Sequence, residues 1–484
     1  MGKIELYKEK IQAMSPATKA SFALIIAKFV QKGMSMISGP IFTRIMPQAE
    51  YGLVSTFTSW QSVLYIIATL NMSQGIFNNG MIDYKKDRDM FTYSLMCLAN
   101  VCTLLTATIY ILTYQWASEF IDMPAILMVV MLLYFIFTPA YNFWMGRQRF
   151  EYKYKAITFV MIGASLLSTV LAIVAVLCVH DGRKAVARIV AMEAVSIVIG
   201  LVMYIRATVK ARGRINLSYW KYALKFNLPL IPHYLSTYVL SSSDRIMITK
   251  LVGSDQPAIY NVAYTVASIM LIFWNSVDAA YAPWIYQHMD ENNIEPIKKR
   301  GNQVVIFFGG VTIFLSLFAP EIIRILAPES CYVGIYVVPA VAAGVFFTAC
   351  YSLYMRIELF LKKNKSITVA TILSAVLNVV LNYFFIPIYG FTAAGYTTLV
   401  CYALLALFHG YNLKRIGYGS VYDNKRVVTI ALLVIVASLC VINLYGFQWI
   451  RYCLIVIIMI VGYRKRHTII NLIKSLPDYE SCSG

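Results

Sequence analysis

Long apolar stretches, separated by short polar connections, run along almost the whole chain. Most of them have about 20 residues, the length of helix that crosses the hydrocarbon core of a bilayer. The pattern predicts fourteen membrane-spanning helices and therefore an all-α polytopic membrane protein. The expected segments are 20–42, 51–74, 91–114, 123–145, 156–179, 186–204, 224–248, 258–280, 303–319, 335–357, 367–387, 391–411, 427–445 and 449–463.

Lys and Arg gather in every second connection, which predicts the orientation of the chain. The basic connections include residues 206–221, 298–300 and 362–365, and the tail at 464–466 continues the pattern. Cytoplasmic loops carry such an excess of basic residues, so both termini are expected to be cytoplasmic. The formal net charge of +19 then reports orientation and not a nucleic-acid partner. Only 13% of the residues are charged, against about 25% in a soluble domain.

The chain carries a weak internal repeat. The first segment ends in Thr43 and Arg44, and the seventh ends in Thr249 and Lys250; each is followed by a short polar loop and a Tyr. Segments six apart run in the same direction, so two pseudo-symmetric six-helix bundles are expected, with two additional C-terminal helices. Arg44 and Lys250 are then predicted at the outer membrane face, as gate residues. The expected domains are an N-terminal bundle (1–205), a basic cytoplasmic linker (206–223), a C-terminal bundle (224–412), and two further helices with a cytoplasmic tail (413–484).

Two lysines lie deep inside the first predicted helix. Segment 20–42 has 23 residues, about 34 Å of helix, and Lys28 and Lys32 lie roughly 12 and 18 Å from its start. Burying one ammonium at that depth costs about 2.5–3.5 kcal/mol. Two on the same helix face cost more unless water or an anion meets them, and snorkelling reaches only from near a helix end. We therefore expect a positively charged cavity within the membrane and a negatively charged cargo.

Other polar side chains follow the first, second, seventh and eighth segments, which suggests four helices around one hydrated space. Besides the two lysines, the candidate substrate-binding residues are Gln31, His233, Arg245 and Asn275. The candidates for binding a coupling sodium ion or proton are Asp244 and Asp278. Asp244 and Arg245 are sequence neighbours and do not share a helix face, so each needs its own partner. Ser and Thr in these helices have an ordinary alternative, which is to bond their own backbone or pack helix on helix.

Motifs of soluble enzymes are absent from the sequence. There is no Walker sequence and no HExxH, and the nine cysteines are scattered without a CxxC pair, so no metal site and no cofactor are expected. Connections of about 20 residues or fewer leave no room for a soluble catalytic domain. Asp83, Asp87 and Asp89, interleaved with basic residues, are expected to form a solvated loop.

Several stretches resemble the bacterial polysaccharide flippase family, which exports O-antigen, capsule and exopolysaccharide units. They are residues 224–233 (LKFNLPLIPH), 243–248 (SDRIMI), 259–264 (IYNVAY) and 382–395 (NYFFIPIYGFTAAG), with EYG at 50–52. The fourth is close to the P-x-Y-G-x-x-G-A-A run common in that family. Ile259 departs from the family pattern, which often has Gly there.

The resemblance implies fold, cargo and location. The family belongs to the superfamily of multidrug and toxin extrusion transporters and peptidoglycan-precursor flippases. It implies two six-helix bundles, alternating access and transport of undecaprenyl-diphosphate-linked oligosaccharides across the bacterial cytoplasmic membrane. It implies a cationic cavity to which Lys28, Lys32 and Arg245 would belong by position. Membrane lipids, a polysaccharide polymerase and export machinery are the expected partners, and nucleic acid is not.

Three other interpretations compete with the flippase. The first is an ion-coupled multidrug antiporter of the same fold, but cationic drugs need buried carboxylates and the deep charges here are mostly positive. The second is a membrane-embedded glycosyltransferase or polymerase, which generally needs a sizeable loop outside the membrane. The third is a structural scaffold, in which lysines at mid-membrane depth would be costly without use.

Overall fold

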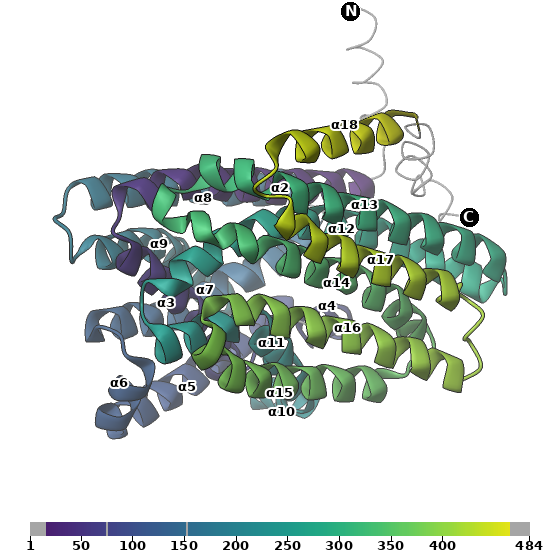
Figure 1. Ribbon diagram of the computed structural model, residues 1–484. Coiled ribbons are helices and arrows are strands. Elements are labelled where there is room, and N and C mark those ends of the chain that lie inside the picture. Colours follow the sequence, from purple (N-terminus) through teal and green to yellow (C-terminus); the bar gives the residue numbers. More distant parts are fainter. Residues whose placement is uncertain (1–15, 74–75, 152, 465–484) are drawn as a thin grey trace, which may run out of the picture. The chain divides into compact units, whose positions relative to one another are not determined.

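The computed structural model describes residues 16–73, 76–151 and 153–464, and these residues form helices joined by short connections (Figure 1). The all-α prediction is confirmed. Two compact units divide the chain, Met1–Tyr238 and Val239–Gly484. Each is described by itself.

The first unit contains six long helices and several short ones. In chain order they are α2 (Pro16–Ile45), α3 (Gln48–Thr69), α4 (Ile76–Asp83), α5 (Arg88–Leu112), α6 (Tyr114–Ile121), α7 (Ala125–Phe150), α8 (Tyr154–Leu177), α9 (Lys184–Ala211), α10 (Leu217–Asn227) and a 3-10 turn (Leu228–Leu230). Helix α9 packs against α7 and α8, and α8 also packs against α2. One core of this unit is aromatic: buried Phe77 of α4 contacts both Phe91 of α5 and Phe143 of α7, which are also buried.

Helix α11 (Ile231–Val252) passes from the first unit into the second. The other helices of the second unit are α12 (Gln256–Asp290), α13 (Ile294–Leu326), the 3-10 helix η2 (Glu329–Tyr336), α14 (Val338–Phe360), α15 (Asn364–Tyr389), α16 (Phe391–Arg415), α17 (Asn424–Asn443) and α18 (Gln448–Arg464). Helix α14 packs against α12, α13, α16 and α17, and most of its residues are buried. Its sequence suits this central position, because its first half is apolar all round and rich in Ala, which lets neighbouring helices approach closely.

The last two helices pack against other helices of the second unit, and a buried cation adds to this packing. Helix α17 packs along α13 and α14, and α18 contacts α13. The Arg451 side chain on α18 is 2% exposed, donates to the Leu317 carbonyl oxygen at 2.9 Å and forms an ion pair with Glu321 on α13. Breaking such a buried pair is strongly destabilising because one charge stays uncompensated, so α18 is firmly attached to α13.

Ten of the described helices are long and apolar enough to cross a membrane, so the chain is a multi-pass membrane protein. They are α5, α7, α8, α9, α12, α13, α14, α15, α16 and α17. Four of the fourteen predicted spans, those in α2, α3, α11 and α18, are outside this set. Helix α18 has only 17 residues, and the other three carry the polar side chains that the sequence singles out. The number fourteen stays a prediction.

Several boundaries differ from the predicted ones. The ninth segment, expected over 303–319, is the middle of the 33-residue helix α13, because hydropathy detects only the apolar part of a helix that continues into water. The seventh segment was expected to begin at residue 224, but α10 ends at Asn227 and α11 begins at Ile231. Pro229 lies between them and has no N–H to continue the hydrogen-bond ladder.

Helix α10, which begins inside the predicted linker, packs against α4 and α5 within the first unit. The Tyr219 hydroxyl donates to Asp87 Oδ2 and the Tyr222 hydroxyl to Asp83 Oδ2, both at 2.6 Å. Burial and the bond to Asp87 together raise the pKa of Tyr219 to about 12. Trp220 donates to the Ser94 carbonyl oxygen at 2.7 Å. Asp83 is exposed and Asp87 half-buried, as expected for a solvated acidic stretch, and each also accepts a hydrogen bond from a tyrosine over 130 residues away in sequence.

Removing both tyrosine hydroxyls should loosen α10. A hydrogen bond to a charged acceptor contributes about 1.5–3 kcal/mol, so each lost bond should raise the undocked population about tenfold or more. Trypsin should then cut faster at the exposed Arg212 and Arg214, which lie just before α10, in Y219F/Y222F than in the unmodified protein. The exposed Tyr411 gives the control Y411F. Equal cleavage rates in all three proteins would show that the two hydrogen bonds do not hold the linker.

Candidate functional site

The two lysines of the first predicted span lie on α2, which is an unbroken helix through both positions. Lys28 is exposed and Lys32 is half-buried. Among the described side chains Lys28 has no ion-pair partner. Since they are four residues apart on one helix, the ammonium groups project from neighbouring positions of one face.

A different face of α2 fixes the helix to α8. Ala27 is fully buried against Ile157 and Met161, and the Gln31 side chain donates from Nε2 to the Met161 carbonyl oxygen at 3.3 Å. Gln31 thus has a structural partner, and it stays only a candidate for contact with cargo. Because Ala27 and Gln31 are each one position before a lysine, their packing fixes the direction in which Lys28 and Lys32 project.

The serines of the second predicted span bond to the backbone of their own helix. Ser55 donates to the Tyr51 carbonyl oxygen at 3.3 Å, Ser59 to Ser55 at 2.9 Å and Ser62 to Thr58 at 2.8 Å. The predicted gate residue Arg44 likewise donates to the Pro40 carbonyl oxygen, at 2.9 Å. These bonds to the helix's own backbone need no ligand.

The second unit holds a buried polar network centred on Asp244 of α11. Asp244 is fully buried, and its Oδ2 accepts from the Tyr260 hydroxyl at 2.6 Å and the Thr398 hydroxyl at 3.0 Å. Its Oδ1 accepts from Asn382 Nδ2 at 2.7 Å. The network therefore joins α11, α12, α15 and α16, four helices of one unit.

Two further residues extend the network on α15 and α16. Asn382 also donates to Asn378 Oδ1 at 3.2 Å and accepts from the Thr397 hydroxyl. Asn378 Nδ2 donates to Thr398 at 3.3 Å. The Asp244 carboxylate thus faces three donors, the Asn382 amide N–H and the Tyr260 and Thr398 hydroxyls. Its own oxygens and these hydroxyl oxygens are ligands that hard cations such as sodium prefer. Hydrogen bonds alone rarely offset the cost of burying an ionised carboxylate, so a bound proton or cation would stabilise the cluster.

Arg245 has hydrogen-bond partners of its own, apart from this carboxylate, as expected for a sequence neighbour. Its Nε donates to Asn261 Oδ1 at 3.3 Å and its Nη1 to the Ser241 carbonyl oxygen at 2.9 Å. The guanidinium lies 4.3 Å from the centre of the Tyr264 ring. Contact with an aromatic face stabilises a cation without neutralising its charge. Arg245 is 8% exposed, so it lies inside the unit and not at its surface.

The remaining predicted site residues fall in different surroundings. Asp278 forms a two-point ion pair with Arg356 of α14, with the Arg356 Nε 2.9 Å from Asp278 Oδ1. Asp278 would have to leave Arg356 before it could bind a cation, which favours Asp244 as the coupling carboxylate. Asn275 is exposed, His233 is half-buried, and Lys250 is exposed near the end of α11.

Sequence reasoning missed a second buried ionisable pair in this unit. Glu358 of α14 and His409 of α16 are both fully buried, and His409 Nδ1 lies 3.1 Å from both carboxylate oxygens. Asn412 Nδ2 donates to Glu358 Oε1 at 3.1 Å. A Glu and a His inside apolar stretches are a usable signal, because ionisable residues in membrane helices are rare and need partners.

Comparison with known proteins identifies the family. The family model "Polysaccharide biosynthesis protein" matches residues 17–289, more than half of the chain. The chain belongs to this family. A second family model, MatE, matches residues 229–384. No curated protein matches the sequence.

Solved structures share the fold at low sequence identity. The lipid II flippase MurJ in an inward closed conformation aligns with a TM-score of 0.65 at 13% identity, over 92% of this chain and 99% of that chain. An inward-facing multidrug resistance transporter of the MATE family and MOP superfamily aligns with a TM-score of 0.57 at 13% identity, over 85% and 98%. A Pyrococcus furiosus MOP superfamily transporter, described as having reversed polarity of its binding pocket, aligns at 0.56 and 16% identity, over 85% and 98%. The chain therefore shares the fold of these MOP superfamily structures.

Proposed function

We propose that the protein flips undecaprenyl-diphosphate-linked oligosaccharide repeat units across the bacterial cytoplasmic membrane by alternating access. The units would supply surface polysaccharide such as O-antigen or capsule. The observation that carries this proposal is the match of residues 17–289 to the polysaccharide biosynthesis family. The shared fold supports it, because the aligned protein MurJ is described as a lipid II flippase.

The cations of α2 fit the proposed cargo. A diphosphate carries about two negative charges and must leave water to cross the hydrocarbon core. Lys28 and Lys32 would offset that dehydration, since charge-assisted hydrogen bonds to phosphate are about twice as strong as neutral ones. Arg245 would add a third cation, with Gln31, His233 and Asn275 as polar contacts to the sugars. The polyprenyl tail would stay in lipid, and a polymerase would receive the unit on the outer side.

Direct transport separates this proposal from the multidrug antiporter. Vesicles containing the purified protein should move a fluorescent polyprenyl-diphosphate oligosaccharide from one leaflet to the other, and should not accumulate a cationic dye. The buried carboxylates Asp244 and Glu358 favour the antiporter, because a cationic drug needs a buried carboxylate. Dye accumulation driven by an ion gradient, without flipping of the lipid, would replace the flippase by the antiporter.

The orientation belongs to the same proposal, with fourteen spans and both termini in the cytoplasm. Single cysteines at the exposed positions Gln115 and Asp181, in a background without the nine native cysteines, should react with an impermeant thiol reagent added to intact cells. A cysteine at Lys210 should react only after the cells are opened. Labelling at Lys210 in intact cells would contradict the orientation.

A further inference from the structure

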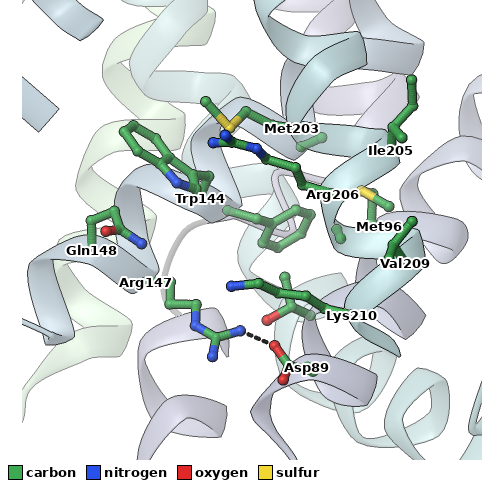
Figure 2. Close-up of a pocket in the computed structure, with 14 residues that line it drawn as sticks. Asp89, Met96, Trp144, Arg147, Gln148, Met203, Ile205, Arg206, Val209 and Lys210 are labelled. Atoms are coloured by element: carbon green, nitrogen blue, oxygen red, sulfur yellow. Dashed lines mark hydrogen bonds and ion pairs between the residues drawn. The ribbon is translucent and has the colours of Figure 1, made fainter. Parts of the chain in front are cut away.

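A pocket of about 480 Å³ lies in the first unit, where α5 begins and where α7 and α9 end (Figure 2). Three cations line it, Arg147 from α7 and Arg206 and Lys210 from α9, together with the single carboxylate Asp89. In Figure 2 the Arg206 and Lys210 side chains extend from α9 to the same side, the Arg206 guanidinium lies near the Trp144 indole, and Arg147 points to Asp89. The lining therefore has a formal excess of two positive charges.

The charge of Arg147 is already neutralised within the unit. Arg147 forms ion pairs with Asp89 and with Glu151, whose Oε1 lies 2.7 Å from the Arg147 Nε. Lys153 approaches the other Glu151 oxygen at 2.6 Å. Burial alone would raise the pKa of Glu151, but the bonds from Arg147 and Lys153 outweigh it and lower that pKa to about 2. Glu151 is thus fully ionised at neutral pH and committed to these two partners.

Arg206 and Lys210 are left without a counter-charge. They lie four residues apart on one face of α9, and both are exposed. Neither forms an ion pair with any side chain that the structure describes. Two like charges one turn apart repel each other slightly, so an anion between them would be stabilised by both.

Most of the remaining pocket lining is apolar, with Thr92 and Gln148 as further polar members, and it adjoins exposed apolar surface. Phe143, Met96 and Met203 form its buried wall. Ile205 and Val209, which alternate with the two cations on α9, are 53% and 71% exposed. Large apolar side chains with such exposure on a membrane helix face acyl chains. The pocket therefore lies at the boundary where hydrocarbon meets water, with cations and apolar surface within a single turn of helix.

We propose that this pocket binds an anionic glycerophospholipid, with its phosphate between Arg206 and Lys210 and an acyl chain along the apolar wall. Basic pockets between membrane helices bind anionic lipid head groups in this way. A lipid with a compensating amine, such as phosphatidylethanolamine, would bring a positive charge to a site that already has an excess of two. Free phosphate would gain the cations but not the apolar wall. The inference is independent of the proposed cargo, because none of the pocket residues belongs to the candidate transport site.

Native mass spectrometry of the purified protein tests the site directly. Phosphatidylglycerol should bind the unmodified protein at least tenfold more tightly than phosphatidylethanolamine, and millimolar inorganic phosphate should not displace it. The variant R206Q/K210Q should lose at least tenfold in affinity for phosphatidylglycerol, and R206K should retain most of it. The matched control is K414Q/R415Q, which removes the same charges from the exposed end of α16 in the other unit.

Three results would overturn the proposal. They are unchanged phosphatidylglycerol affinity in R206Q/K210Q, an equal loss in K414Q/R415Q, and displacement of the lipid by inorganic phosphate. If the double variant fails to fold, as judged by gel filtration and thermal unfolding, R206Q and K210Q are measured singly. Each should then weaken binding about threefold or more, and unchanged affinity in both would equally overturn the site.

Discussion

Reversing the charge of both α2 lysines, in K28E/K32E, should abolish surface glycan in a strain that lacks its own copy of the transporter. Two unit charges 4 Å apart interact by about 4 kcal/mol at an effective dielectric constant of 20. Replacing attraction by repulsion at two positions therefore changes the energy of the bound diphosphate by several kcal/mol. Each 1.4 kcal/mol is a factor of ten, so export should fall at least a hundredfold.

Conservative substitutions at Lys28 and Lys32, and charge reversal at distant lysines, show whether export needs positive charge at these two positions. K28A or K32A should each reduce export, while K28R/K32R should retain more activity, although the planar guanidinium differs from the ammonium. The same reversal at two exposed loop lysines, K362E/K363E, is the matched control and should leave export near normal. Glycan is normalised to the amount of protein in the membrane. Near-normal glycan from K28E/K32E would mean that these cations do not handle the cargo, and the proposal of an anionic substrate would fall.

The long helices could be predicted from the sequence because each is a local property of the chain. An apolar run of about 20 residues predicts a helix whatever its neighbours are, and the run from Phe391 is found as α16. The apolar signal is weaker in α2 and α11, because the polar candidate site residues lower the mean hydropathy of these helices. The docked helix α10 was missed for another reason, since it is short and its partners Asp83 and Asp87 are distant in sequence.

The candidate site could be predicted only where a single residue is conspicuous by itself. Asp244 stands out because an acid in a membrane helix is rare. Its partners Asn382 and Thr398 do not, because Asn and Thr in apolar helices resemble packing residues, and they lie 138 and 154 positions away. Asp278 is also conspicuous in the sequence, but its partner could not be predicted. Arg356 lies on α14, and only the fold brings the two side chains together.

Neutralising Asp244 should uncouple transport from its ion gradient. In D244N the side chain keeps its size and one acceptor oxygen, but the carboxylate that would bind a sodium ion or proton is gone. Tyr260, Thr398 and Asn382 all donate to Asp244 now, so one donor must turn away from the new amide nitrogen. That loss costs about 1–3 kcal/mol of stability, which should lower the thermal unfolding midpoint by a few degrees without preventing insertion.

Flipping by vesicles is then measured with a sodium gradient at equal pH, and separately with a pH gradient without sodium. The unmodified protein should respond to one of the two gradients, and D244N should respond to neither, with its rate reduced at least tenfold. The matched control is D290N, the same change on an exposed carboxylate at the end of α12. D278N tests the alternative carboxylate, which the structure shows already bound to Arg356. If D244N keeps the full gradient dependence while D278N loses it, the coupling ion binds on the α12 side of the unit. The buried network of α11, α15 and α16 would then serve only to hold these helices together.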